Sequence, residues 1–365
     1  MRALTAVPGV ADSARVKNVP EPPLSDGSVL ARTLALGICG TDREILQGYG
    51  AAPPGEEHLI LGHESLAMVE VAPAGCGLVA GDLIVGIVRR PDPEPCAACA
   101  AGEWDMCRNG RYTERGIKER HGYGAERFRI EPQFAVKIEP ELGNLGVLLE
   151  PASILAKAWD HAERIGRRSR GGQPRVVLVT GAGPIGLLAA LMGAQRDLEV
   201  HVLGRTRGGA KEQLVRDLGG TFHIDAGILH HLAPDLILEC TGASSVIQAC
   251  LAASAPAGIV CLTGVTLPGR LSQIDIGGLN RRLVLDNDCV FGSVNANRRH
   301  YEMAARSLAR ADRDWLRRLI TRRVPLERAS EALAHRPEDI KVVVDFAAAE
   351  TGARALGEAA VEHRA

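Results

Sequence analysis

The chain has 365 residues, of which 46% are hydrophobic and 24% charged, and its formal net charge is -1. This length is too great for one core and predicts about two domains, while the near-neutral charge without a basic stripe argues against nucleic acid or an anionic membrane as a partner. No apolar stretch is long enough to span a membrane and the first residues lack a signal-peptide core, so we expect a cytoplasmic protein.

The first half of the chain consists of short apolar runs separated by Gly and Pro, a pattern typical of strands and turns. We therefore expect a mostly antiparallel β domain over residues 1–155. Its predicted strands are 28–36, 66–71, 83–88, 127–130 and 135–138.

The second half changes pattern. Residues 154–164 have helical periodicity, and from residue 175 apolar strands alternate with segments suited to crossover helices. This alternation predicts an α/β domain with a doubly wound parallel sheet over residues 156–299. Its predicted strands are 176–180, 199–203, 221–224, 236–239, 259–262 and 290–294, the last of them at an edge of the sheet.

The C-terminal part is more polar. After residue 297 a helical region leads to a further strand at 341–346, and residues from about 300 to 365 are expected to complete the first domain. The tail from Ala347 is rich in Ala and Glu, as in a helix or a frayed end.

A glycine fingerprint occupies residues 176–186, where a strand runs into Gly181, Gly183 and Gly186. The first glycine permits a tight turn, the second lets the backbone approach a pyrophosphate, and the third allows close packing of helix on strand. Free N–H groups of a helix that starts near Pro184 and Ile185 would hold the phosphates. Such a motif alone often marks an ordinary turn, but the strand before it and the helix after it favour a dinucleotide site.

The end of the second strand of this domain indicates which dinucleotide binds. NAD sites place an acidic residue there, whereas this chain has Gly204, followed by Arg205 and Arg207. Two guanidinium groups without a carboxylate favour a 2′-phosphate, so we expect NADP, with NAD as a possible second cofactor. The alternative is that these arginines only solubilise a loop.

The nine cysteines are odd in number and, in a large cytoplasmic chain, are expected to stay reduced. Cys240, Cys250, Cys261 and Cys289 lie in apolar surroundings and are interpreted as small core residues.

Cys39 and His63, with Glu64 beside the histidine, supply the donor types of a catalytic zinc that leaves one position open. Glu150, where the β domain ends, is a candidate third ligand. Taken singly, these residues would more often be a buried thiol, a hydrogen-bonded core histidine and a surface acid.

A second cysteine cluster has the spacing of a closed structural zinc site: Cys96, Cys99 and then Cys107. One ligand is missing. Asp92 or Glu94 could supply an oxygen, and the alternative is that the site binds no metal.

These elements resemble the zinc-containing medium-chain dehydrogenase/reductase superfamily over nearly the whole chain, and within it the glucose 1-dehydrogenases of archaea and some bacteria. The narrower resemblance rests on residues 37–42, 61–64, 89–91, 113–117 and 292–295. Two departures are Ala67, where the superfamily usually has glycine, and the absent first cysteine of the second cluster, which puts only that metal in doubt.

The resemblance implies a GroES-like catalytic domain, a Rossmann domain and a homodimer or homotetramer. It implies a catalytic zinc on Cys39, His63 and Glu150, with Glu64 as an alternate ligand or water partner, and sugar contacts from Glu114 and Asn295. We also assign three residues to the cofactor site: Thr241, Gly264 and Ser293.

The expected reaction is oxidation of the anomeric hydroxyl of an aldose, with Thr41 passing the proton outward and hydride going to NADP+, which gives the lactone. For Thr41 the alternative is a simple turn hydroxyl, and for Glu114 a solvated acid. Two other functions remain open: a zinc-dependent polyol, amino-cyclitol or secondary-alcohol dehydrogenase, and a non-catalytic NADP-binding protein.

Overall fold

The computed structural model describes residues 1–171, 173–266 and 273–346, and the chain divides into two compact units. Of the described residues, the first unit comprises Met1–Glu150, Ala296–Ala309 and 319–346, and the second comprises those in Pro151–Asn295 and Arg310–Arg318. The predicted domain limits, 1–155 and 156–299, lie within a few residues of these divisions and stay a prediction. The predicted tail from Ala347 lies outside the described residues.

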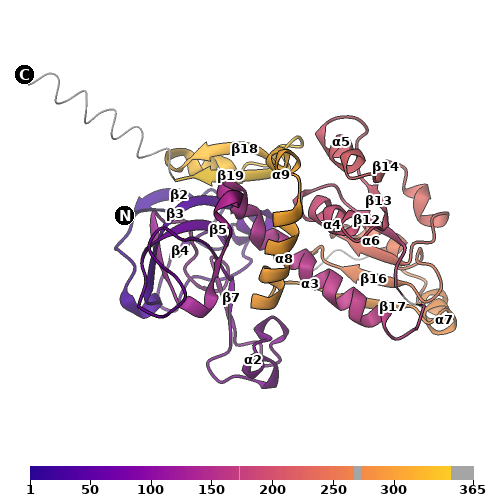
Figure 1. Ribbon diagram of the computed structural model, residues 1–365, viewed down its shortest axis with the longest axis horizontal. Coiled ribbons are helices and arrows are strands. Elements are labelled where there is room, and N and C mark those ends of the chain that lie inside the picture. The colour runs from indigo at the N-terminus through magenta and orange to yellow at the C-terminus, as the bar shows by residue number, and fades with distance from the viewer. Residues whose placement is uncertain (172, 267–272, 347–365) are drawn as a thin grey trace, which may run out of the picture. The chain divides into compact units, whose positions relative to one another are not determined.

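The first unit is built on a mostly antiparallel sheet with the order β11-β6-β5-β3-β19-β18, in which β10 also pairs with β3. Figure 1 labels β3, β5, β18 and β19 of this sheet. Two smaller sheets have the orders β2-β1-β4 and β7-β8-β9. The strands are β1 Arg2–Ala6, β2 Arg15–Asn18, β3 Val29–Ile38, β4 Leu59–Ile60, β5 Glu64–Val71, β6 Leu83–Gly86, β7 Arg89–Arg90, β8 Thr113–Arg115, β9 Glu119–Arg120, β10 Arg127–Ile130, β11 Ala135–Lys137, β18 Ile320–Pro325 and β19 Lys341–Asp345.

The long strand β3 shows why the sequence forms this sheet. Its residues alternate between buried and half-buried from Val29 to Leu34, as expected for a strand with one face on the core. From Ala35 to Ile38 every residue is buried, because both faces of the strand are now covered. The next residue, Cys39, is half-buried and directly follows this buried stretch.

The helices of the chain are α1 Gly40–Ile45, α2 Ala97–Ala100, α3 Leu149–Gly166, α4 Pro184–Ala194, α5 Ala210–Asp217, α6 Ser244–Cys250, α7 Ile276–Leu285, α8 Arg298–Arg310 and α9 Arg313–Leu319. Short 3₁₀ segments are η1 Leu24–Asp26, η2 Trp104–Met106, η3 Pro132–Phe134, η4 Pro140–Leu148, η5 Ala226–His230 and η6 Leu326–Leu333. Within the described residues, none of these helices is long and apolar enough to cross a bilayer.

One part of the expected helical region is wrong: residues 320–325 form strand β18, parallel to β19. Its sequence, Ile-Thr-Arg-Arg-Val-Pro, carries polar side chains at half of its positions because the strand lies at an edge of the sheet. Only pairing with β19 makes this stretch a strand, and local pattern does not reveal such a partner.

The second unit is a parallel sheet with the order β14-β13-β12-β15-β16-β17, which confirms the predicted doubly wound fold. Edge strand β17 is also as predicted. The strands are β12 Val176–Thr180, β13 Glu199–Leu203, β14 Thr221–His223, β15 Leu236–Glu239, β16 Ile259–Leu262 and β17 Cys289–Gly292. Strands β12, β13, β15 and β16 have the predicted ends, β14 ends one residue earlier than predicted, and β17 begins one residue and ends two residues earlier.

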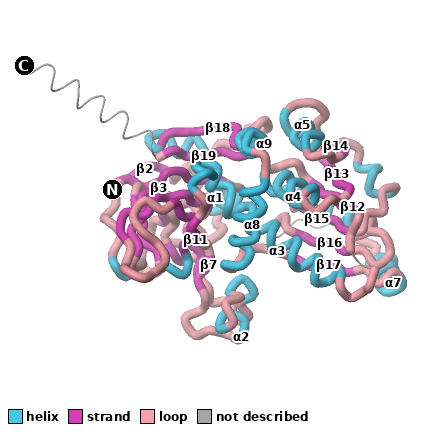
Figure 2. The backbone as a smooth tube through the Cα atoms, in the orientation of Figure 1, coloured by secondary structure: helices cyan, strands magenta, loops and turns pink. Residues whose placement is uncertain are grey.

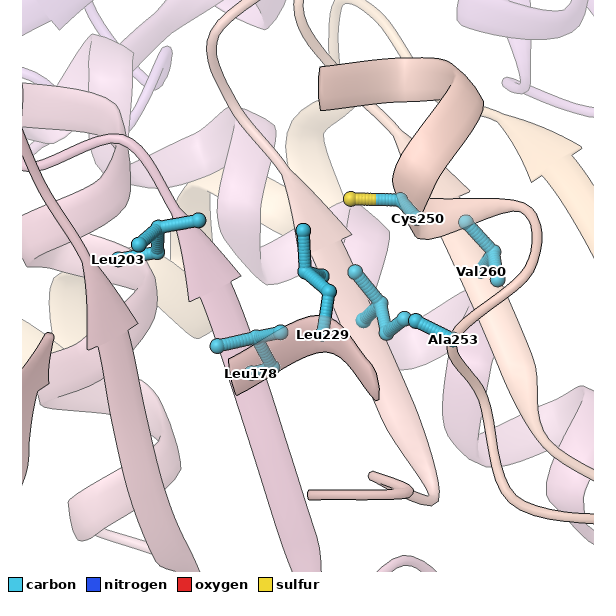
Figure 3. Packing of buried hydrophobic residues seen from close by; sticks show 7 residues of the cluster. Leu178, Leu203, Leu229, Cys250, Ala253 and Val260 are labelled. Atoms are coloured by element: carbon cyan, nitrogen blue, oxygen red, sulfur yellow. The ribbon is translucent and has the colours of Figure 1, made fainter. Parts of the chain in front are cut away.

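Figure 3 shows the packing on one face of this sheet. Leu178, Ile237 and Val260 are register partners on neighbouring strands and therefore point to the same side, where Leu229 and Cys250 cover them. The interpretation of Cys250 and Cys261 as core residues is confirmed, whereas Cys240 and Cys289 are half-buried.

Candidate functional site

Cys39 follows β3 and begins helix α1. Its sulfur accepts a hydrogen bond from the backbone N–H of Thr41 (3.3 Å), while the Asp42 carboxylate accepts one from the backbone N–H of Cys39 (2.9 Å). These reciprocal bonds form a capping box that fixes the cysteine side chain at the start of the helix.

His63 lies against this cysteine. Its Nε2 is 3.1 Å from the sulfur of Cys39, and its Nδ1 is 3.5 Å from a carboxylate oxygen of Asp42. Burial by itself would lower the pKa of His63, but the charges of Cys39 and Asp42 raise it well above the ordinary value. A carboxylate behind one ring nitrogen and a sulfur before the other is the arrangement that orients a metal-binding histidine. Asp42 was missed in the sequence, although its position three residues after Cys39 is that of a capping box.

Glu150 occupies the first turn of α3 and is buried. A carboxylate oxygen of Glu150, one of Glu64 and a ring nitrogen of His63 all lie within 4.8 Å of one another. Burial is the main reason that the pKa of Glu150 rises to about 7. A bound cation would keep this carboxyl ionised, so the sulfur, nitrogen and oxygen donors of Cys39, His63 and Glu150 fit a zinc ion.

Glu64, expected as an alternate ligand or water partner, forms a buried ion pair. Its carboxylate oxygens lie 2.6 and 2.5 Å from Nζ of Lys341, at the start of β19. Burial by itself would lower the pKa of Lys341, but the charges of Glu64, Cys39 and Glu150 raise it. Lys341 was missed, although a lysine that opens an apolar strand needs a buried partner.

We expect Lys341→Met to lower the free energy of unfolding by about 3 kcal/mol or more, because it leaves the Glu64 carboxylate buried without its cation. Urea denaturation of Lys341→Met and of the unaltered protein measures this difference in the free energy of unfolding. The double variant Glu64→Gln, Lys341→Met removes both charges and is expected to recover most of the loss. Equal stability of Lys341→Met and the unaltered protein would contradict this interpretation of the pair.

Thr41 is half-buried in the first turn of α1, adjacent to Cys39. Glu114 lies in β8 and is buried rather than a solvated acid. Its carboxylate accepts hydrogen bonds from Nε (3.1 Å) and Nη2 (2.9 Å) of Arg89, whose guanidinium stacks on the ring of Tyr112 at 3.6 Å. Arg89 therefore fixes the orientation of the Glu114 carboxylate and so the direction from which it can accept a further hydrogen bond.

The second cysteine cluster lies at α2 and η2: Cys96 directly precedes α2, Cys99 lies within it, and Cys107 directly follows η2. Figure 2 shows α2 in a segment that consists mostly of loop. The sulfurs of Cys96, Cys99 and Cys107 lie within 4.8 Å of one another, and a hydrogen bond from the backbone of Arg108 is the main cause that lowers the pKa of Cys96 to about 6. This set fits a metal that prefers thiolates.

The two candidates for the fourth ligand of that cluster, Asp92 and Glu94, already have other partners. The Asp92 carboxylate accepts a hydrogen bond from the backbone N–H of Glu94 (2.8 Å), and its other oxygen lies 3.3 Å from Nε of Arg111. The exposed carboxylate of Glu94 pairs with the same arginine at 2.7 Å. A structural zinc with Asp92 as fourth ligand stays a prediction.

The glycine fingerprint lies in the second unit, as expected. Gly181 follows β12 with φ +93°, a conformation that side chains disfavour, and Gly183 precedes α4, which begins at Pro184 and continues with Ile185. A Cβ at Gly186 would overlap the carbonyl oxygen of Gly181, so the helix can approach the turn only with glycine there. Apart from its neighbours in the chain, no atom of the described residues lies within 4 Å of the Cβ position of Gly183, which leaves space in front of the helix N-terminus.

The arginines predicted to bind a 2′-phosphate follow Gly204 at the end of β13. Arg205 and Arg207 are exposed, and Arg207 lines a pocket with Gly208, Glu212 and Arg216. The carboxylate of Glu212 accepts hydrogen bonds from the backbone N–H of Gly208 (2.5 Å) and from Nη2 of Arg216 (2.6 Å). The pocket thus presents arginines, and sequence reasoning missed Arg216.

The other residues assigned to the cofactor lie at the carboxyl ends of neighbouring strands in the same unit. Thr241 follows β15, Gly264 follows β16 and the buried Ser293 follows β17. The predicted sugar contact Asn295 lies in the loop after β17 with φ +61°, and Lys157 donates a hydrogen bond to the carbonyl of Val294 at 2.9 Å. Ligands of open α/β sheets bind at this edge.

Comparisons with known proteins agree with this arrangement. Residues 143–346 match the family described as "Glucose dehydrogenase C-terminus", and residues 25–140 match "Alcohol dehydrogenase GroES-like domain". The glucose 1-dehydrogenase of Methanocella arvoryzae is 39% identical over 360 residues, which cover 95% of this chain and 100% of the relative. That of Thermoproteus tenax is 41% identical over 354 residues, which cover 94% of this chain and 99% of the relative.

A solved structure is similar over the same extent. The glucose dehydrogenase of Haloferax mediterranei, in complex with NADP, Zn and gluconolactone, is 32% identical with a TM-score of 0.87. The match covers 95% of this chain and 99% of that one.

Proposed function

Since this chain belongs to the zinc-containing medium-chain dehydrogenase/reductase superfamily and, within it, to the glucose 1-dehydrogenases, we propose that it oxidises glucose or a similar aldose at C1 with NADP+. The net reaction moves a hydride from C1 of the sugar to the nicotinamide and releases a proton, so that the aldose becomes its lactone. Cys39, His63 and Glu150 are proposed as zinc ligands, because the sulfur of Cys39 and a carboxylate oxygen of Glu150 each lie close to the buried ring of His63.

The observation that carries this proposal is that the buried His63 belongs to two groups of possible ligand atoms, one with Cys39 and one with Glu150. When bound there, zinc supplies a Lewis acid that lowers the pKa of a hydroxyl and stabilises negative charge on its oxygen. A protein that only bound NADP would gain nothing from burying these donors together. The similarity to the Haloferax mediterranei enzyme, which was solved with NADP, Zn and gluconolactone, supports the same reaction.

The chain's own residues then have separate roles. Asp42 orients the His63 ring, and Thr41, next to Cys39, passes the proton of the sugar hydroxyl outward through hydrogen bonds. Glu114, held by Arg89, accepts hydrogen bonds from sugar hydroxyls, and Asn295 supplies a further contact. Gly181 to Gly186 hold the pyrophosphate of the cofactor, and Arg205 and Arg207 its 2′-phosphate.

A panel of aldoses, polyols and simple secondary alcohols, each tested with NADP+ and NAD+, tests the proposed substrate. We expect kcat/KM for glucose with NADP+ to exceed that for any polyol by at least about tenfold, because a site built for hydrogen-bonding hydroxyls discriminates by their placement. A preference for a polyol, an amino-cyclitol or a secondary alcohol would show a related dehydrogenase with the same chemistry. Binding of NADP+ without oxidation of any alcohol would favour a non-catalytic role.

We also propose that the protein is a cytoplasmic homodimer or homotetramer. Edge strand β17 can pair across a two-fold axis, and Ile276, Val284 and Leu285 of α7 are exposed apolar side chains of the same unit. The free thiols of the cysteines fit a reducing compartment. Sedimentation that shows only monomer would contradict the oligomer.

A further inference from the structure

Glu239, the last residue of β15, is fully buried in the unit that carries the glycine fingerprint. Its carboxylate accepts hydrogen bonds from the backbone N–H groups of Thr241 (2.7 Å) and Gly242 (3.2 Å). The hydroxyls of Thr180 (3.3 Å) and Thr241 donate to the same carboxylate. A buried carboxylate is costly without such donors, and none of the roles proposed above uses this one.

The main chain of Glu239 makes a second set of bonds. Its carbonyl oxygen accepts from the hydroxyl (2.7 Å) and backbone N–H (2.8 Å) of Thr263 and from the N–H of Gly264 (3.1 Å). A Cβ at Gly264 would overlap the backbone nitrogen of Gly242 and lie 2.8 Å from a carboxylate oxygen of Glu239. Glu239 therefore holds together the turns that follow β15 and β16, together with Thr180, which ends β12.

The sheet order places these turns relative to the cofactor. Strand β13, which leads to Arg205 and Arg207, lies on one side of β12, and β15 and β16 lie on the other. A dinucleotide bound across the carboxyl ends of these strands has its pyrophosphate at the turn after β12. If its adenosine half lies at β13, its nicotinamide half lies at β15 and β16. The methyl group of Thr241 is 2.9 Å from the Cβ position of Gly181, so the turn after β15 directly adjoins the fingerprint.

We propose that Glu239 is a positioning residue for the nicotinamide half of NADP+: its side chain and main chain fix the turns at Thr241–Gly242 and Thr263–Gly264. The proposal rests on the proposed function for the presence of the cofactor, but it concerns only this unit. A carboxylate suits the role because all the groups around it are donors, and it offers acceptors alone. Glu239 itself needs no contact with substrate or cofactor.

Glu239→Gln tests the inference, since it keeps the size of the side chain but puts an NH2 group, which is a donor, in place of the oxygen Oε2, which accepts a hydrogen bond from the N–H of Gly242. We expect the Kd for NADP+, measured by calorimetry, to rise about tenfold, as one unsatisfied buried hydrogen bond of this kind predicts. Adenosine 2′,5′-bisphosphate reaches only the adenosine end of the site, so its Kd should stay unchanged. A general loss of structure in this unit would instead raise the Kd of both ligands alike.

Two further variants complete the experiment. Thr263→Val removes one hydrogen bond to the main chain of Glu239 and is expected to weaken NADP+ by a few-fold, again without effect on the bisphosphate. It provides the test if Glu239→Gln does not fold. Ile237→Val in the same strand is the matched packing control and should change stability but neither Kd.

An unchanged Kd for NADP+ in the folded Glu239→Gln variant would overturn the inference. An equal rise in the Kd for adenosine 2′,5′-bisphosphate would overturn it as well. If only Thr263→Val folds, the same two results in that variant would overturn it. Failure of the unaltered protein to bind NADP+ would instead contradict the proposed function, so the two failures are distinguishable.

Discussion

Cys39→Ala and His63→Ala are each expected to lower kcat/KM for glucose by about a thousandfold or more, since a metal-bound site stabilises the transition state by several kcal/mol. The reason is local: each change removes one donor of the buried site at the end of β3 or the start of β5. The Kd for NADP+ should stay close to that of the unaltered protein, because the glycine fingerprint lies in the other unit. Steady-state kinetics, calorimetry and elemental analysis of zinc measure the three quantities.

Cys76→Ala is the matched control for these variants. Cys76 is a half-buried cysteine of the same unit whose Sγ lies 3.7 Å from the carbonyl of Leu78, away from the cysteine clusters. We expect it to keep full activity and zinc content. Turnover retained in metal-free Cys39→Ala protein would refute a zinc-dependent reaction at this site.

The second large effect is expected at the adenosine end of the cofactor site. Replacing Arg205 and Arg207 together by Ala should raise the KM for NADP+ by about a hundredfold, because hydrogen bonds between charged groups contribute about 1.5–3 kcal/mol each. The KM for NAD+, which has no 2′-phosphate, should change little. Cofactor preference would then shift toward NAD+, as kinetics with both dinucleotides can measure.

Arg317→Ala, an exposed arginine on α9 of the same unit, controls for the loss of positive charge in general. Arg207→Lys keeps the charge but loses the planar fork, and we expect it to fall between the Ala variant and the unaltered protein. An equal loss of affinity for both cofactors would mean that these arginines do not select the phosphate.

Much of the second unit could be predicted because its central strands β12, β13, β15 and β16 are almost entirely buried. Residues 176–179 are a continuous apolar run that leads through Thr180 into a glycine turn, and both features are local in the sequence. The arginines after β13 were found in the same way, since they stand at a fixed distance from the glycines. Glu239 was missed because a single acidic residue at the end of a strand carries no local sign of the turns that surround it.

In the first unit, most of the features that could not be predicted depend on contacts between distant parts of the sequence. Lys341 and Glu64 are 277 residues apart in sequence, and only the pairing of β19 with β3 and of β3 with β5 brings them together. Strand β18 likewise forms only through its pairing with β19, which no local pattern indicates. Likewise, Arg89 and Glu114 become an ion pair through pairing of β7 with β8. Asp42 is different, since its spacing from Cys39 could have revealed the capping box and hence the partner of His63.

Glucose deuterated at C1 tests the central claim most directly. Incubated with the purified protein and NADP+, it should transfer its deuterium to C4 of the nicotinamide, and mass spectrometry should detect deuterated NADPH together with gluconolactone or its hydrolysis product. Glucose deuterated at C2 should give unlabelled NADPH. If NADPH formed from the C1-labelled sugar carried no deuterium, or if no NADPH formed at all, the account of a C1 aldose dehydrogenase would be contradicted.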